Sequence, residues 1–163
     1  MIPLMKNAFL NEFETRQKLA EFITRNAQLS MGHECYSFEK EFAELQGCKE
    51  AVLVNSGGSA NLAIFQTLKN LGKLKDGDQV GFSALTWSTN VMPIIQLGLV
   101  PVPIDCDPST LNVMSTQFEE RLETTDIKAL FITNVLGFSG DLNVIREICD
   151  KKILFYLKIT VKH

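Results

Sequence analysis

The chain has 163 residues, of which 45% are hydrophobic and 21% charged, a composition typical of a soluble globular protein with one core. Its net charge of −3 comes from interspersed acids and bases, so the sequence lacks the basic run that nucleic acid binding requires. Its apolar stretches fall short of the roughly 20 residues that span a bilayer, and its start has no signal-peptide layout. We therefore expect a cytoplasmic domain that binds neither nucleic acid nor membrane.

Two amphipathic helices are predicted in the first third of the chain. Apolar residues recur at helical spacing among charged ones over residues 11–26 and again over residues 35–46. Gly47 follows the second run directly, in the position where glycine commonly ends a helix. The first helix is expected to pack on a surface.

A strand, a glycine turn and a third helix are predicted next. Residues 50–55 (EAVLVN) form a short apolar run rich in valine, which is typical of a buried strand. The turn SGGS follows at residues 56–59, and helical spacing returns over residues 59–70. The inward face of this helix is expected to carry Leu62, Phe65 and Leu68.

Short apolar runs and helical patterns then alternate to residue 157. The expected strands are 79–83, 100–104, 129–134 and 153–157, and the expected helices are 88–97, 115–123 and 141–150. Such alternation predicts a parallel sheet covered by helices, an α/β fold. In a parallel sheet, ligands collect at the carboxyl ends of the strands, so the loops after the strands are the places to search for a site.

The first of these loops is NSGGSAN at residues 55–61. Its small residues let the backbone approach an anion closely, and the start of the following helix offers unpaired amide donors and a positive dipole end. Phosphate is the ligand that such a loop would bind. A tight turn with an ordinary helix cap explains the same residues equally well, because the loop has neither Walker nor dinucleotide-binding spacing.

The second loop is ALTWS at residues 84–88, which carries the single tryptophan of the chain. A flat heteroaromatic ligand could stack on Trp87 beside the first loop. The alternative is that Trp87 is a large anchor in a core or an interface.

Other polar residues are weaker candidates. Asp105 and Asp107 could bind a metal, although the sequence Asp107-Pro108-Ser109 also opens an ordinary turn, which we favour. Asn134 ends a strand and could touch a ligand or hold the loop that follows. The two histidines and four cysteines have no metal-binding or redox spacing, so we expect no metal site and reduced, packing cysteines. They are His33, His163, Cys35, Cys48, Cys106 and Cys149.

Five sequence blocks, in their order, resemble the DegT/StrS family of sugar-nucleotide aminotransferases and dehydratases, within the fold type I pyridoxal phosphate (PLP) enzymes. The blocks are MGHECYSFEKEFA (31–43), VNSGGSANL (54–62), TWSTN (86–90), GLVPVPIDCDPSTL (98–111) and TNVLG (133–137). The resemblance implies the three-layer α/β/α sheet of the large domain of these enzymes, here truncated. It divides the chain into an N-terminal helical segment (1–30), a partial PLP-binding large domain (31–157) and a tail (158–163).

The resemblance also gives the two loops a common ligand, PLP or pyridoxamine 5′-phosphate. It implies that the backbone amides of Gly57 and Gly58 bind the cofactor phosphate and that Trp87 stacks on the pyridine ring. Position 58 is glycine where relatives commonly have serine, so one hydroxyl contact would be missing unless Ser59 or another donor replaces it.

A tryptophan before serine in the second loop resembles the subgroup that acts on nucleotide-linked 4-keto-6-deoxyhexoses, including the 3-dehydratases. The implied activity is 3-dehydration of such a sugar in deoxysugar and polysaccharide biosynthesis. Transamination with glutamate as amino donor is the second candidate, and a non-catalytic binding or assembly fragment is the third. The resemblance further implies a homodimer.

The end of the chain departs from this family. Relatives continue from the last strand into Glu-Asp-Asn-Cys-Glu, whose aspartate pairs with the pyridinium nitrogen, and later supply a catalytic lysine or histidine. Here the chain reads KITVKH over residues 158–163, so we assign no catalytic residue to it and expect the chain alone to be inactive. One choice of codons for Glu-Asp-Asn-Cys-Glu-Thr, GAA GAT AAC TGT GAA ACA T, encodes KITVKH when it is read without its first base, which suggests a frameshift near residues 153–157. A native ending is the alternative.

Overall fold

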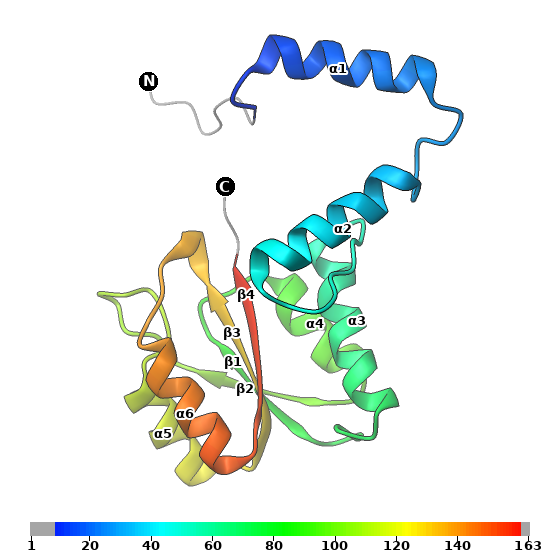
Figure 1. The fold of residues 1–163 in the computed structure, drawn as a ribbon. Coiled ribbons are helices and arrows are strands. Elements are labelled where there is room, and N and C mark those ends of the chain that lie inside the picture. The colour runs from blue at the N-terminus through cyan, green and yellow to red at the C-terminus, as the bar shows by residue number, and fades with distance from the viewer. Residues whose placement is uncertain (1–8, 161–163) are drawn as a thin grey trace. The chain divides into compact units, whose positions relative to one another are not determined.

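The computed structural model describes residues 9–160 (Figure 1). The chain divides into two compact units. The first unit ends at Val54 and the second begins at Asn55. Within the described residues, no helix is both long enough and apolar enough to cross a membrane.

The first unit contains the two helices that the sequence predicted. They are α1 (Glu12–Arg25) and α2 (His33–Gln46). Helix α2 ends at Gly47, which adopts the left-handed conformation with φ of 66° and donates its amide to the carbonyl oxygens of Ala43 and Glu44. Glycine reaches this conformation without steric cost, which explains why the helix stops there.

The strand predicted at residues 50–55 is wrong, because this segment forms no strand in the structure. The amide of Leu53, which a strand would donate to a neighbouring strand, instead donates to the Glu39 carboxylate at 2.7 Å. Val52 is 79% exposed. An apolar run becomes a strand only where a partner satisfies its backbone groups, and no described segment pairs with this one.

The second unit is an alternation of helices and strands, and this confirms the predicted α/β class. Its elements are α3 (Gly57–Asn70), β1 (Gln79–Ser83), α4 (Ser88–Gln96), β2 (Val100–Ile104), α5 (Ser115–Thr124), β3 (Ile127–Asn134), the short 3-10 helix η1 (Val135–Gly137), α6 (Leu142–Lys152) and β4 (Phe155–Thr160). The strands pair in parallel in the order β2-β1-β3-β4.

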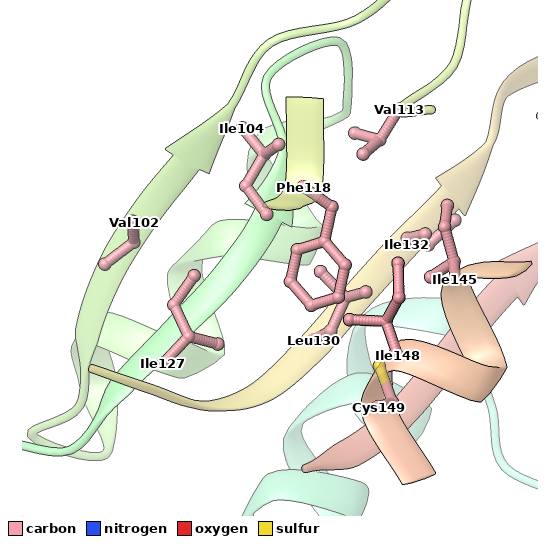
Figure 2. Packing of buried hydrophobic residues seen from close by; sticks show 10 residues of the cluster. All are labelled: Val102, Ile104, Val113, Phe118, Ile127, Leu130, Ile132, Ile145, Ile148 and Cys149. Carbon is pink, nitrogen blue, oxygen red and sulfur yellow. The ribbon is translucent and has the colours of Figure 1, made fainter. Parts of the chain in front are cut away.

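Helices cover both faces of this sheet, which gives the predicted three layers. On one face, Phe65 of α3 and Ile94 of α4 pack against Val80, Ala129 and Phe131. On the other face, α5 and α6 cover a second cluster (Figure 2), in which Phe118 and Ile145 meet sheet residues such as Leu130 and Ile132. From Ala129 to Ile132, successive residues of β3 therefore alternate between the two cores, as the pleat of a strand requires.

Two details of the packing differ from the sequence prediction. Leu62 of α3, expected to face inward, is 39% exposed, whereas Phe65 is fully buried. The last strand was predicted to begin at Ile153, but α6 continues to Lys152 and Ile153 lies at its end in the left-handed conformation, 90% exposed. Strand β4 therefore begins at Phe155 and runs to Thr160.

The first three residues of the tail, 158–160, belong to β4. Lys158, Ile159 and Thr160 pair with the last three residues of β3. Val161, Lys162 and His163, which complete the tail, lie outside the described residues.

The direction in which the chain adds strands to the sheet reverses between β1 and β3. This reversal determines where a ligand can bind. The chain passes from β1 outward to β2 and then returns to β3 on the other side of β1. The connections after β1 and after β3 therefore leave in opposite directions from neighbouring strands, and a crevice for ligands forms outside such a switch point.

Candidate functional site

The loop before α3 forms a well-defined helix start. Ser56 is the N-cap residue, and its hydroxyl oxygen accepts a hydrogen bond from the amide of Ser59 at 3.2 Å. The two hydroxyl groups, of Ser56 and Ser59, also lie 3.2 Å apart, within hydrogen-bonding distance. The carbonyl oxygen of Ser56 accepts from the amide of Ala60 at 3.0 Å, so the last two amides of the first turn are satisfied within the loop.

Gly57 and Gly58 have the two remaining amides of this first turn. Neither amide has a hydrogen-bond acceptor within residues 9–160, as expected for the start of a helix. A Cβ added at Gly57 would meet no atom within 4 Å, and one added at Gly58 would meet only the Ser56 hydroxyl oxygen at 3.8 Å. The space beside these two glycines is therefore open at the helix start, and the helix dipole there favours binding of an anion. No acidic residue lies in this first turn.

Trp87 lies directly before α4, as its N-cap residue, with extended backbone angles (φ −90°, ψ 151°). It is 38% exposed, which excludes a fully buried core anchor and leaves the two other roles, a stacking surface and an interface anchor. The loop that carries it follows β1, and the amide of Ala84 in this loop bonds to the carbonyl oxygen of Ile104 at 2.9 Å. Trp87 is thus placed at the carboxyl edge of the sheet.

A buried polar network joins the two loops. The side-chain amide of Asn61 in α3 donates to the side-chain oxygen of Asn90 in α4 at 2.8 Å, and each side chain is 2% exposed. Asn90 in turn donates to the hydroxyl oxygens of Thr86, at 2.8 Å, and Thr133, at 3.1 Å. The amide of Thr133 donates to the Ser83 hydroxyl at 3.1 Å. The ends of β1 and β3 and the starts of α3 and α4 are therefore held together.

Sequence reasoning did not single out this network. Asn61 lies between Ala60 and Leu62, and Asn90 directly precedes Val91 and Met92, so a polar residue next to apolar helical positions could have been the signal. Their contact joins residues 29 apart in the chain, which no local pattern reveals.

Asn134 holds a loop instead of facing the two helix starts. Its side-chain oxygen accepts from Asn112 at 3.0 Å, and Asn112 also donates to the carbonyl oxygen of Phe138 at 3.0 Å. Both asparagines are buried. Of the two roles that the sequence left open for Asn134, the structural one is observed.

The acidic pair after β2 forms the turn that was favoured over a metal site. Asp107 accepts hydrogen bonds from the hydroxyl and the amide of Ser109, and these bonds lower the pKa of Asp107 below its ordinary value. Asp105 accepts the amide of Cys106 at 2.8 Å. Among the described residues, no three His, Cys, Asp or Glu side chains gather as metal ligands would.

The four cysteines are free thiols, and Cys149 is the one that is buried. Burial raises the pKa of the Cys149 thiol to about 11, with a smaller contribution from the charge of Asp150. A protonated thiol in an apolar core is unreactive, so Cys149 is a packing residue. His33 is exposed at the first position of α2, and His163 lies outside the described residues.

A cavity of about 510 Å³ lies elsewhere at the carboxyl edge, between the ends of β1 and β2 and helix α5. Its lining includes Asp105, Gln117 and Arg121, and from the second candidate loop it includes Ala84 but not Trp87. We favour the loops as the site, because they combine backbone amides at a helix start, a helix dipole and a partly exposed aromatic ring. The cavity wall instead contains the acidic Glu120 next to Arg121, and a carboxylate there disfavours an anion.

Residues 11–158 match the model of the DegT/DnrJ/EryC1/StrS aminotransferase family. The chain is 38% identical over 133 residues to GDP-4-keto-6-deoxy-D-mannose 3-dehydratase of Yersinia pseudotuberculosis, covering 79% of this chain and 33% of the relative. It is also 38% identical over 130 residues to the spore coat polysaccharide biosynthesis protein SpsC of Bacillus subtilis, covering 80% of this chain and 32% of that protein.

The fold matches a solved structure of the Escherichia coli GDP-4-keto-6-deoxy-D-mannose-3-dehydratase with bound hydrated PLP. The TM-score is 0.82 at 28% sequence identity, and the match covers 97% of this chain and 40% of the enzyme. This chain therefore spans about a third of the length of the curated relatives it matches.

Proposed function

Because the chain belongs to the DegT/DnrJ/EryC1/StrS aminotransferase family, we propose that it is the cofactor-binding part of a PLP-dependent enzyme that acts on a nucleotide-linked keto sugar. The observation that carries the proposal is the helix start at Gly57 and Gly58, whose two amides have no acceptor in the part of the chain that the structure describes and which lies beside the loop of Trp87. The residues present fit the cofactor, since an anion and a flat ring each find a matching surface.

In this proposal the amides of Gly57 and Gly58 bind the phosphate group of the cofactor. The α3 dipole stabilises its negative charge, and the first turn contains no carboxylate that would repel it. The hydroxyl of Ser59, which lies beside that of Ser56, is placed to donate a further hydrogen bond. Trp87 stacks on the pyridine ring and thereby orients it.

PLP supplies an electron sink for the carbanion formed on a bound substrate. The residues of this chain bind and orient that group. The proton-transferring residue and the partner of the ring nitrogen would come from outside the chain. The proposed homodimer would consist of two copies of the whole enzyme. The sugar and glutamate would likewise bind mainly outside these residues.

Two reactions share this site. We propose 3-dehydration of a nucleotide-linked 4-keto-6-deoxyhexose as the activity of the whole enzyme, on the basis of the identity to the Yersinia 3-dehydratase. Transfer of an amino group to the sugar is the second candidate, and it would use the same cofactor contacts.

Titration of the chain with pyridoxamine 5′-phosphate tests the proposal. This form of the cofactor has an amine in place of the aldehyde, so it cannot react with surface lysines. We expect saturable quenching of the fluorescence of Trp87, the single tryptophan. The Gly57→Pro variant is the matched control, because proline suits the first position of a helix but has no amide to donate.

The variant is expected to keep its thermal stability and to bind the cofactor roughly tenfold more weakly, as the loss of one hydrogen bond to a charged group predicts. Absence of saturable binding by the unmodified chain would contradict the proposal. Equal affinity in the Gly57→Pro variant would exclude the α3 start as the phosphate site.

A further inference from the structure

Asn61 and Asn90 form the one hydrogen bond between side chains of α3 and α4 among the described residues. Asn61 lies four residues after Gly57, one turn into α3, and Asn90 lies three residues after Trp87. Their side chains are each 2% exposed and are joined by a hydrogen bond of 2.8 Å. Burial of polar groups is costly unless they are hydrogen-bonded, so this pair is held to one arrangement.

The direction of every hydrogen bond in the pair follows from one backbone carbonyl. Asn61 donates its side-chain amide to the carbonyl oxygen of Thr89 at 3.3 Å, and a carbonyl can only accept. Asn90 must therefore present its oxygen to Asn61 and its amide group to the opposite side. There it donates to the hydroxyls of Thr86 and Thr133, which lie 2.7 Å from each other.

The network ties the loop of Trp87 at both sides. Thr86 directly precedes Trp87 and bonds to Asn90, while Thr89 follows it and bonds to Asn61. Thr133 connects the same group to β3 in the middle of the sheet. A displacement of α4 relative to α3 would break several buried hydrogen bonds together, and each would leave an unpaired polar group.

We propose that Asn61 and Asn90 are a positioning pair that fixes the loop of Trp87 relative to the phosphate-binding start of α3. The pair does not touch the cofactor. It sets the separation between the site for the phosphate group and the surface on which the ring stacks. The positioning of Trp87 is a property of the unliganded chain, and its consequence for cofactor affinity rests on the proposed function.

The test uses the variants Asn61→Leu and Asn90→Leu, with Asn112→Leu as the matched control. Asn112 is also fully buried and also donates to two acceptors, but its partners are Asn134, the last residue of β3, and Phe138 in the loop that follows. The first readout needs no cofactor: acrylamide quenching and fluorescence anisotropy of Trp87, with the melting temperature measured in parallel. Trp87 reports alone because the chain has no other tryptophan.

We expect greater acrylamide quenching and lower anisotropy of Trp87 in Asn61→Leu and Asn90→Leu than in the unmodified chain. Asn112→Leu is expected to lower the melting temperature without changing the signal of Trp87. The double variant Asn61→Leu/Asn90→Leu covers the case in which a single variant does not fold, because replacing both partners by apolar groups restores much of the stability. Unchanged Trp87 signals in the folded variants, or equal changes in Asn112→Leu, would overturn the proposal.

The second readout is the titration with pyridoxamine 5′-phosphate. We expect the folded variants of the pair to bind it roughly tenfold more weakly and with less quenching at saturation, and Asn112→Leu to bind it normally. If the unmodified chain does not bind it, the proposed function fails, while the cofactor-free signals of Trp87 still decide the role of the pair.

Discussion

Gly58 is the second residue of α3, at the position where the resemblance to the family leads us to expect serine. A Cβ there would meet only the Ser56 hydroxyl oxygen at 3.8 Å, so the structure has room for a larger side chain. We predict that Gly58→Ser binds pyridoxamine 5′-phosphate more tightly, by about tenfold, because a hydroxyl is added near the phosphate. Fluorescence titration of Trp87 measures the change.

Gly58→Ala is the control for this prediction. It adds the same Cβ without a hydroxyl, and its gain in helix propensity over glycine is larger than that of serine. Its affinity for the cofactor should remain that of the unmodified chain. Equal tightening in both variants would show that helix stability, and not the hydroxyl, sets the affinity.

Cys149 gives a prediction of pH dependence at the residue scale. Its folded-state pKa is raised from the ordinary value of 9.0 to about 11, mainly by burial. The unfolded thiol therefore ionises first as the pH rises. The stabilising contribution of the neutral thiol is fully present below pH 9 and is lost as the pH rises toward about 11.

Urea unfolding of the chain and of Cys149→Ala at several pH values between 9 and 11 checks this sign. The loss of stability with pH should be shallower in Cys149→Ala, although a part remains because burial also raises the pKa of Tyr156. If the stability of Cys149→Ala falls with pH as steeply as that of the unmodified chain, the assignment of this pH dependence to Cys149 is wrong.

At the scale of elements, the sequence predicted strands that are flanked by clear turn signals and have partners inside the chain. Strands β1 and β2 coincide with residues 79–83 and 100–104 as predicted. Residues 50–55 have equally good strand composition but no partner among the described residues, and composition alone does not reveal a partner. The loops at Gly57 and Trp87 could be predicted because their signals are local in the sequence. The contact between Asn61 and Asn90 could not be predicted, because it joins residues 29 apart.

Gly140, in the loop before α6, offers a test of packing between elements. A Cβ at this position would lie 2.6 Å from the carbonyl oxygen of Val113 and 2.9 Å from the sulfur of Met114. The carbonyl belongs to the backbone and cannot rotate away as a side chain can. We predict that Gly140→Ala lowers the free energy of unfolding by about 1–3 kcal/mol in urea titrations.

Gly58→Ala serves again as the comparison, since its Cβ would meet no atom closer than 3.8 Å. It should be neutral or slightly stabilising, because alanine favours a helix more than glycine does. Equal stability of Gly140→Ala and the unmodified chain would show that the loop before α6 shifts freely.

At the scale of the whole molecule, the chain covers about a third of the length of its relatives. The proposed frameshift near residues 153–157 makes a prediction for the coding DNA. Sequencing past codon 163 should reveal a frame that continues as Glu-Asp-Asn-Cys-Glu and reaches a lysine or histidine motif, which would also distinguish amino transfer from dehydration. If no frame continues in this way, a native ending and a non-catalytic binding role replace the frameshift.

The most direct test of the account is a nitrogen-15 NMR titration of the labelled chain with pyridoxamine 5′-phosphate. We predict saturable shifts of the backbone amides of Gly57 and Gly58 and of the indole of Trp87, with one dissociation constant for all three. Shifts confined to the cavity beside Arg121, or no saturable shift at all, would contradict the assignment of the α3 start and Trp87 as the cofactor site.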